Sequence, residues 1–171
     1  MFQIDDLVMY DGTGVCRVAD ITEEDFGGKF APKLYYILEP LYQTGTIYAP
    51  VNNEKVYMRP VISAGEANEL IDQFPGVTIE VFKSSSTQQL SKHYQSVIDS
   101  HEILSLVKLT KSIHRKGEDA RRQNRHLGQI DKKYMHLAED LLLGELAAAL
   151  DIPREDVPDY IHDRIGEAET E

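Results

Sequence analysis

The sequence has no tryptophan and a single cysteine, Cys16, among its 171 residues. One cysteine cannot form an intrachain disulfide, and it excludes a zinc site built from several thiolates. No apolar run approaches the roughly 18 residues that a membrane-spanning helix needs. The first residues also lack the basic and apolar regions of a secretion signal. We therefore expect a soluble cytoplasmic protein that has no membrane partner.

Positive charge is scarce on average, because 18 Lys and Arg residues face 29 Asp and Glu residues, for a net charge of −11. That average argues against nucleic-acid binding, which requires basic side chains. The charge is uneven, however: residues 1–75 carry −7, residues 151–171 carry −6, and residues 108–133 carry +6. A basic block of this density can bind phosphates, although a solvated helix face has the same composition.

The first 62 residues have the pattern of a β domain. Short segments rich in Val, Ile and Tyr are separated by turn residues, which is typical of strands. Five short strands in about 60 residues are too few for a large sandwich, so we predict a small Tudor-like or SH3-like β-barrel. The expected strands cover residues 6–10, 15–21, 34–39, 46–49 and 56–59.

From Ser63 onward the apolar residues recur at helical spacing, so residues 63–171 are predicted to form an all-α domain. Ser63 and Glu66 fit a capping box at the start of the first helix. A second helix is expected from about Thr87 to Ile98. These two domains give the chain an α+β fold.

The remaining helix boundaries follow from caps and polarity. Ser100 is a plausible N-cap for a third helix. Residues 116–129 are too polar to be buried and are expected to be helical only in part. Asp131 is expected to cap a long helix with a wide apolar face, and Pro153 to start a short last helix before an acidic tail.

Signals for catalysis are weak. The six histidines are scattered, with no pair spaced as in a metalloprotease helix. Cys16 lies in the middle of a predicted strand and is more typical of a small packed side chain than of a nucleophile. We therefore expect no enzymatic activity, no metal and no other cofactor.

Two binding surfaces remain. Thr46, Ile47, Tyr48 and Ala49 are a candidate edge strand, whose pairing Pro50 would end and whose backbone would accept a partner's strand. An ordinary barrel strand is the alternative interpretation. The second surface is the basic helical block, which would contact DNA.

Several segments of the chain resemble one family over nearly its whole length. Four segments are similar to the opening domain of CarD/CdnL-type transcription regulators, a domain that the transcription-repair coupling factor shares. They are residues 2–10, 14–18, 35–38 and 47–53. The stretch 137–147, with its Gly-Glu-Leu-Ala, resembles the last long helix of that family. Residues 56–63 and the Ile152-Pro153 ending resemble Firmicutes-type members.

This resemblance implies a barrel that docks on the β subunit of bacterial RNA polymerase by pairing an edge strand. It also implies a helical domain that contacts the upstream edge of the promoter bubble and stabilises the open complex, often at ribosomal RNA promoters. The docking residues carried over by position are Glu24, Thr46, Ile47, Tyr48 and Ala49. The DNA contacts carried over are Lys92, Lys132 and Lys133, and charge counting adds Lys108, Lys111, Arg115, Arg121, Arg122 and Arg125.

Two departures from the family alter these expectations. Well-studied members have Arg at the positions of Glu24 and Tyr48, so docking here would rest on backbone pairing. They also insert a Trp into the minor groove near residues 87–90, and this sequence has none. We therefore expect weak, salt-dependent binding of promoter DNA by a monomer that reaches the nucleoid through RNA polymerase. The alternative is a polymerase-binding adaptor whose helical domain recruits another protein.

Overall fold

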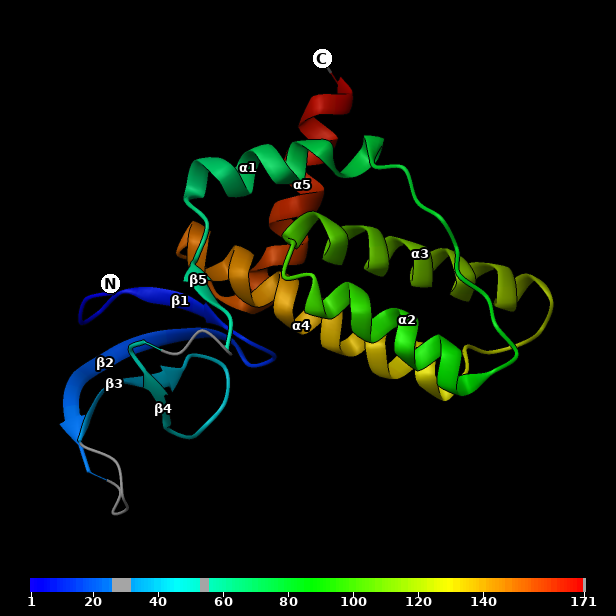
Figure 1. The fold of residues 1–171 in the computed structure, drawn as a ribbon. Coiled ribbons are helices and arrows are strands. Elements are labelled where there is room, and N and C mark those ends of the chain that lie inside the picture. The colour runs from blue at the N-terminus through cyan, green and yellow to red at the C-terminus, as the bar shows by residue number, and fades with distance from the viewer. Residues whose placement is uncertain (26–31, 53–55, 171) are drawn as a thin grey trace. The chain divides into compact units, whose positions relative to one another are not determined.

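The computed structural model describes residues 1–25, 32–52 and 56–170, so Asn53 of the family-like segment lies outside the described residues. The chain folds into two compact units, Met1–Val61 and Ile62–Glu171 (Figure 1). The first unit, called here the sheet unit, is an antiparallel five-stranded sheet, and the second, the helical unit, contains the helices. The predicted α+β fold, with a small β domain followed by an all-α domain, is confirmed.

The sheet unit is a meander with one strand added at its end. Its strand order is β4-β3-β2-β1-β5, which places β4 and β5 at the two edges. Gly12 and Gly14, with φ of 71° and 98°, make the tight turn between the first two strands. The strands are β1 (Leu7–Tyr10), β2 (Gly14–Glu24), β3 (Lys33–Pro40), β4 (Ile47–Pro50) and β5 (Met58–Pro60).

The sheet bends around a core that lies on one of its faces. The register of β2 against β3 shifts between Val18 and Asp20, and such a bulge increases local twist. Cys16 is completely buried, as predicted for a packed side chain, and burial raises the pKa of its thiol to about 11. The buried cluster consists of Val8, Cys16, Val18, Tyr36, Leu38 and Ala49.

The helical unit is built around α4, a helix of 22 residues. Its elements are α1 (Ala64–Gln73), η1 (Phe74–Gly76), α2 (Thr87–Asp99), α3 (Ile103–Arg122), α4 (Gln129–Leu150), η2 (Arg154–Asp156) and α5 (Val157–Thr170). The predicted capping box at the start of α1 is confirmed. The Glu66 amide donates to Ser63 Oγ at 3.1 Å, and the Ser63 amide donates to Glu66 Oε1 at 3.2 Å.

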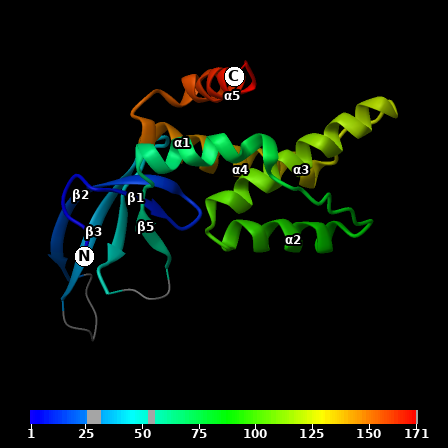
Figure 2. The same cartoon turned by 90° about the horizontal axis from the view of Figure 1, so that it is seen from above.

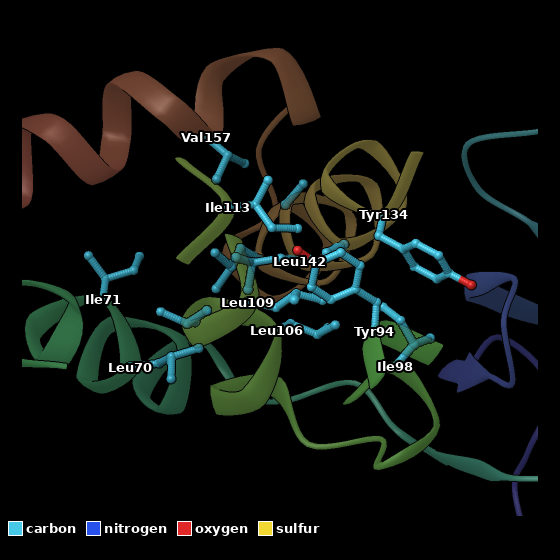
Figure 3. Close-up of a cluster of buried hydrophobic side chains, with 14 of the residues drawn as sticks. Leu70, Ile71, Tyr94, Ile98, Leu106, Leu109, Ile113, Tyr134, Leu142 and Val157 are labelled. Atoms are coloured by element: carbon cyan, nitrogen blue, oxygen red, sulfur yellow. The ribbon is translucent and has the colours of Figure 1, made fainter. Parts of the chain in front are cut away.

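Helix α4 supplies the middle of the core (Figure 3). Tyr134, Ala138, Leu142 and Leu146 recur every four residues, so they form one buried stripe. The other helices pack apolar side chains around this stripe, and those that are completely or almost completely buried include Ile71, Val107, Ile113 and Val157.

The predicted helix starts at Ser100 and Asp131 are wrong. Ser100 follows α2, where its hydroxyl donates to the Val97 carbonyl at 2.7 Å. His101 then adopts a φ of 58°, and α3 begins only after Glu102. Gly128, rather than Asp131, is the N-cap of α4. The hydroxyl of Ser100 thus bonds one turn back, whereas the Asp131 carboxylate accepts from Tyr94 and Lys116, which are distant in the chain.

The expectation that residues 116–129 are not buried and are helical only in part is confirmed, although Lys116 is half-buried rather than exposed. Helix α3 continues to Arg122, and the Lys116 side chain is only 17% exposed. Its ammonium lies 2.9 Å from Asp131 Oδ1, so this half-buried charge has a partner of opposite sign. Gly117 permits close packing here, because a Cβ at this position would lie 3.3 Å from Leu127 Cδ1.

Residues 77–86, called here the strap, carry the chain from η1 to the start of α2 without helix or strand (Figures 1 and 2). Three side chains of α3 hold this region by donating to backbone carbonyls. Lys111 Nζ donates to the carbonyls of Phe74 at 2.6 Å and Val77 at 3.4 Å. Lys116 Nζ donates further along, to the carbonyl of Phe82 at 3.3 Å, and Ser112 Oγ, whose single hydrogen is shared with the Lys108 carbonyl at 2.7 Å, lies 3.2 Å from the Glu80 carbonyl.

Candidate functional site

Strand β4 lies at an edge of the sheet, as the candidate docking strand should. Val51 donates its amide to the Leu34 carbonyl at 3.0 Å, which fixes the alternation of the β3–β4 ladder. Because hydrogen-bonded pairs alternate in antiparallel strands, the amides of Ile47 and Ala49 face β3, and the backbone groups of Tyr48 point away from it. The expected end of pairing at Pro50 is wrong, since Pro50 is paired with Tyr35. Proline is tolerated there because its nitrogen faces away from β3.

The five candidate docking residues occupy different environments. Tyr48 is 46% exposed, whereas the Ala49 side chain is 2% exposed and belongs to the core. Ile47 is half-buried, and Thr46 is exposed just before the strand begins. Glu24, at the end of β2, is half-buried and directly opposite Lys33. The structure therefore brings Thr46 to Ala49 together along one edge and leaves Glu24 two strands away.

The face of the sheet opposite its core carries an apolar strip that sequence reasoning missed. Tyr48 lies opposite Ile37 across the β3–β4 ladder, and Pro50 lies opposite Tyr35. Directly opposed residues share a face, so these four side chains lie together on the side away from Tyr36 and Leu38. The strip adjoins the β4 edge. The alternation of side chains within residues 35–38 predicts this strip once the register of β3 against β4 is known.

Five candidate DNA-contacting residues gather where α3 ends and α4 begins. Each of them is exposed, and Arg122 forms only a long ion pair with Asp119, at 3.7 Å. The start of α2 lies at the same end of the helical unit (Figure 1). We call this group the basic end; it consists of Arg121, Arg122, Arg125, Lys132 and Lys133.

The other four basic candidates lie away from this end. Lys92 is exposed on α2, and Lys108 and Arg115 are exposed on α3. Lys111 is half-buried, and its ammonium donates to the carbonyls of Phe74 and Val77. The structure therefore divides the sequence-defined basic block into an exposed group and lysines that hold the fold.

A buried polar network joins three helices behind the basic end. Tyr94 of α2 donates its hydroxyl to Asp131 Oδ1 of α4 at 2.5 Å, and Lys116 of α3 donates to the same oxygen at 2.9 Å. Burial, followed by the hydrogen bond to the Asp131 carboxylate, raises the pKa of Tyr94. The residues are far apart in sequence, so nothing local indicated the network. It fixes the positions of the helices that carry Lys92, Lys132 and Lys133.

The Gly-Glu-Leu-Ala stretch has a structural role. Glu145 is completely buried, and its Oε2 accepts the Ile62 amide at 3.2 Å, at the first residue of the helical unit. Gly144 is buried beside it, and Leu146 and Ala147 belong to the core. The pattern is therefore explained by packing and by one buried acceptor.

Two further observations concern other kinds of site. Among the described residues, no group of three or more His, Cys, Asp or Glu side chains is arranged to hold a metal ion. In the same part of the chain, no helix is both long enough and apolar enough to span a membrane.

A sheet unit with an edge strand and an adjoining apolar strip has the features of a protein-binding module. Residues 2–62 match the family model of the CarD-like/TRCF RID domain. No curated protein shows a significant sequence match to the chain. Residues 2–62 therefore form a domain of the CarD-like/TRCF RID type, which confirms the resemblance seen in the first part of the sequence, and this domain supports an RNA polymerase-interacting transcription factor. The match ends at residue 62, before the first helix.

Proposed function

We propose that the sheet unit docks on the β subunit of bacterial RNA polymerase by strand addition at β4. The helical unit then contacts promoter DNA and modulates the stability of the open complex, including at ribosomal RNA promoters. In this proposal the protein acts without catalysis. The observation that carries the proposal is the position of β4 at the sheet edge, within the domain that matches the polymerase-interacting family.

Strand addition suits this sequence because it uses backbone groups. The Tyr48 amide and carbonyl point away from β3, toward the side on which a partner strand would pair. Main-chain pairing does not require an arginine, so the Tyr and Glu found at positions 48 and 24 leave it intact. Tyr48, Ile37 and Tyr35 add an apolar surface beside the edge, and aromatic side chains are enriched at protein interfaces.

Electrostatics and helix geometry support the DNA half of the proposal. Lys132 and Lys133 are the fourth and fifth residues of α4, close to its N-terminus, where the helix dipole adds positive potential. Arg121, Arg122 and Arg125 complete the basic end, and exposed Lys92, Lys108 and Arg115 extend the positive surface. Lys111 also contributes positive charge, although its ammonium donates a hydrogen bond to the Phe74 carbonyl. In a chain of net charge −11, this surface supports weak binding that gains from the high local concentration on polymerase.

Tyr48→Pro is the substitution that tests docking. Proline removes the amide that points away from β3, so capture of the full chain by purified RNA polymerase should be lost. Tyr48→Ala, the matched control, keeps the amide and should weaken capture only in part. Ile47→Pro is less informative, because the Ile47 amide faces β3 and its loss would disrupt the sheet itself. Full capture of Tyr48→Pro, with an unchanged circular dichroism spectrum, would overturn the edge assignment.

Labelled promoter fork DNA added to the same polymerase complex separates the two roles of the helical unit. DNA contact predicts that the full chain increases fork retention and that this increase falls steeply between two salt concentrations. A chain that binds polymerase but leaves fork retention unchanged at both concentrations would instead support the adaptor that recruits another protein.

A further inference from the structure

A groove of about 440 Å³ lies in the helical unit between the strap and the helices α2 and α3. Its volume falls in the range of sites that hold small organic ligands, about 300–1,000 Å³. The strap side is held by Lys116, which donates to the Phe82 carbonyl, and by Ser112, whose hydroxyl hydrogen is shared between the carbonyls of Lys108 and Glu80. The walls are therefore fixed by hydrogen bonds within the protein, and the groove is formed before any ligand enters.

One part of the groove is aromatic. Phe82 of the strap stacks on His93 of α2, with ring centroids 3.9 Å apart and an interplanar angle of 15°. Val97 and Leu109, which also line the groove, provide aliphatic surface. Phe82 and His93 each cover one face of the other ring, so a flat ring system can pack only on the outer side of this pair, as planar bases do on Phe and His side chains.

The charged groups of the groove differ in what they already bind. Lys116 has its ammonium near Asp131, the Phe82 carbonyl and the Tyr94 hydroxyl, which use its three donors. Lys108 is exposed at the groove, and no ion pair of its ammonium is found among the described residues. Lys108 is therefore the group that can bind an anion. Glu80, the acidic residue of the lining, offers an acceptor for an amino group.

We propose that this groove is a nucleotide-binding site. It takes a planar base that carries an amino group, against Phe82 and His93, together with a phosphate held by Lys108. The site differs from the basic end, and its occupancy does not depend on polymerase docking or on DNA contact at that end. The same chemistry is present in a free nucleotide and in an unpaired nucleotide of a single strand.

The test titrates the full chain with adenosine 5′-monophosphate and, separately, with a short single-stranded oligoadenylate, followed by calorimetry and amide NMR. Binding should perturb amides of Phe82, His93 and Lys108. Lys108→Met should raise Kd at least about tenfold, because a charge-assisted contact to phosphate is lost. Lys83→Met is the matched control, since Lys83 is an exposed strap lysine outside the groove lining, and it should bind as the wild type does.

The two ligands distinguish the sources of the nucleotide. Groove perturbation by the monophosphate supports a free nucleotide, and perturbation by the oligonucleotide alone supports an unpaired nucleotide of a strand. Lys132→Gln should leave monophosphate binding unchanged, which separates this site from the basic end. The proposal is overturned if neither ligand perturbs the groove at millimolar concentration, if Lys108→Met binds as tightly as the wild type, or if inorganic phosphate competes as well as the monophosphate.

Discussion

The sheet unit and the helical unit present their candidate binding groups in different ways. In the sheet unit the groups are backbone amides and carbonyls at the β4 edge, whose direction follows from the ladder with β3. In the helical unit they are side chains whose positions depend on a buried ion pair and on carbonyls held by α3. Backbone pairing tolerates a change of side chain, and charge recognition does not. If the proposed docking at β4 is correct, it should therefore tolerate substitution of the Tyr48 side chain, whereas the proposed DNA contact should be sensitive to loss of basic side chains.

The two units also differ in where they place ion pairs. Arg17 of the sheet unit bridges Asp5 and Glu39 at the surface, at 2.8 and 2.7 Å. Exposed pairs of this kind contribute little to stability. Lys116 and Asp131 of the helical unit are 17% and 7% exposed, so removal of one partner leaves the other charge without compensation. This difference predicts where a substitution is most damaging.

Asp131→Ala should have the largest effect. The substitution leaves the Lys116 ammonium and the Tyr94 hydroxyl without their acceptor, so the free energy of unfolding should fall by about 3–5 kcal/mol. Urea denaturation followed by circular dichroism measures the change. Asp119→Ala removes the long pair with exposed Arg122 and should cost less than about 0.5 kcal/mol. Equal losses in the two variants would show that the buried network does not organise the helical unit.

Lys132→Gln together with Lys133→Gln should have the next largest effect, on DNA rather than on stability. Both side chains are exposed, so the fold should be retained. Loss of two phosphate contacts should lower the slope of log K against log salt by about 2, and fork affinity by roughly tenfold or more at moderate salt. Fluorescence anisotropy with the polymerase complex measures both. Lys33→Gln together with Arg154→Gln removes the same charge elsewhere, and an equal effect there would contradict a localised contact.

Substitution of Cys16 should have the smallest effect, a change in the pH dependence of stability that is confined to alkaline pH. The folded pKa of the thiol, about 11, lies above the unfolded value near 9, so the folded state binds this proton more tightly. Its contribution is therefore complete below pH 9 and disappears as pH rises toward 11. Over this range the wild type should lose about 1–2 kcal/mol relative to its own value at pH 8, beyond the loss shown by Cys16→Ala. Parallel pH profiles of the two proteins would contradict this role of burial.

Much of the fold follows from local signals. The Ser63 and Glu66 capping box, the change from strand to helix periodicity and the four-residue spacing of Tyr134, Ala138 and Leu142 are all encoded over a few residues. The two helix starts predicted from polar residues, at Ser100 and Asp131, are wrong for different reasons. Ser100 donates to the Val97 carbonyl one turn back, whereas Asp131 accepts from Tyr94 and Lys116, which are distant in the chain.

The same distinction between local and long-range contacts applies to the candidate sites. The sequence alone determined that a short strand lies around Tyr48, which the structure bounds at Ile47 and Pro50, and that positive charge is concentrated in residues 108–133, because both depend on residue type and spacing. Only the tertiary structure decided which amides of β4 face outward, which lysines hold the strap and where the groove lies. Ladder register, carbonyl positions and packing between helices are set by contacts between residues that are distant in the chain. The periodicity of the sequence does not encode these contacts.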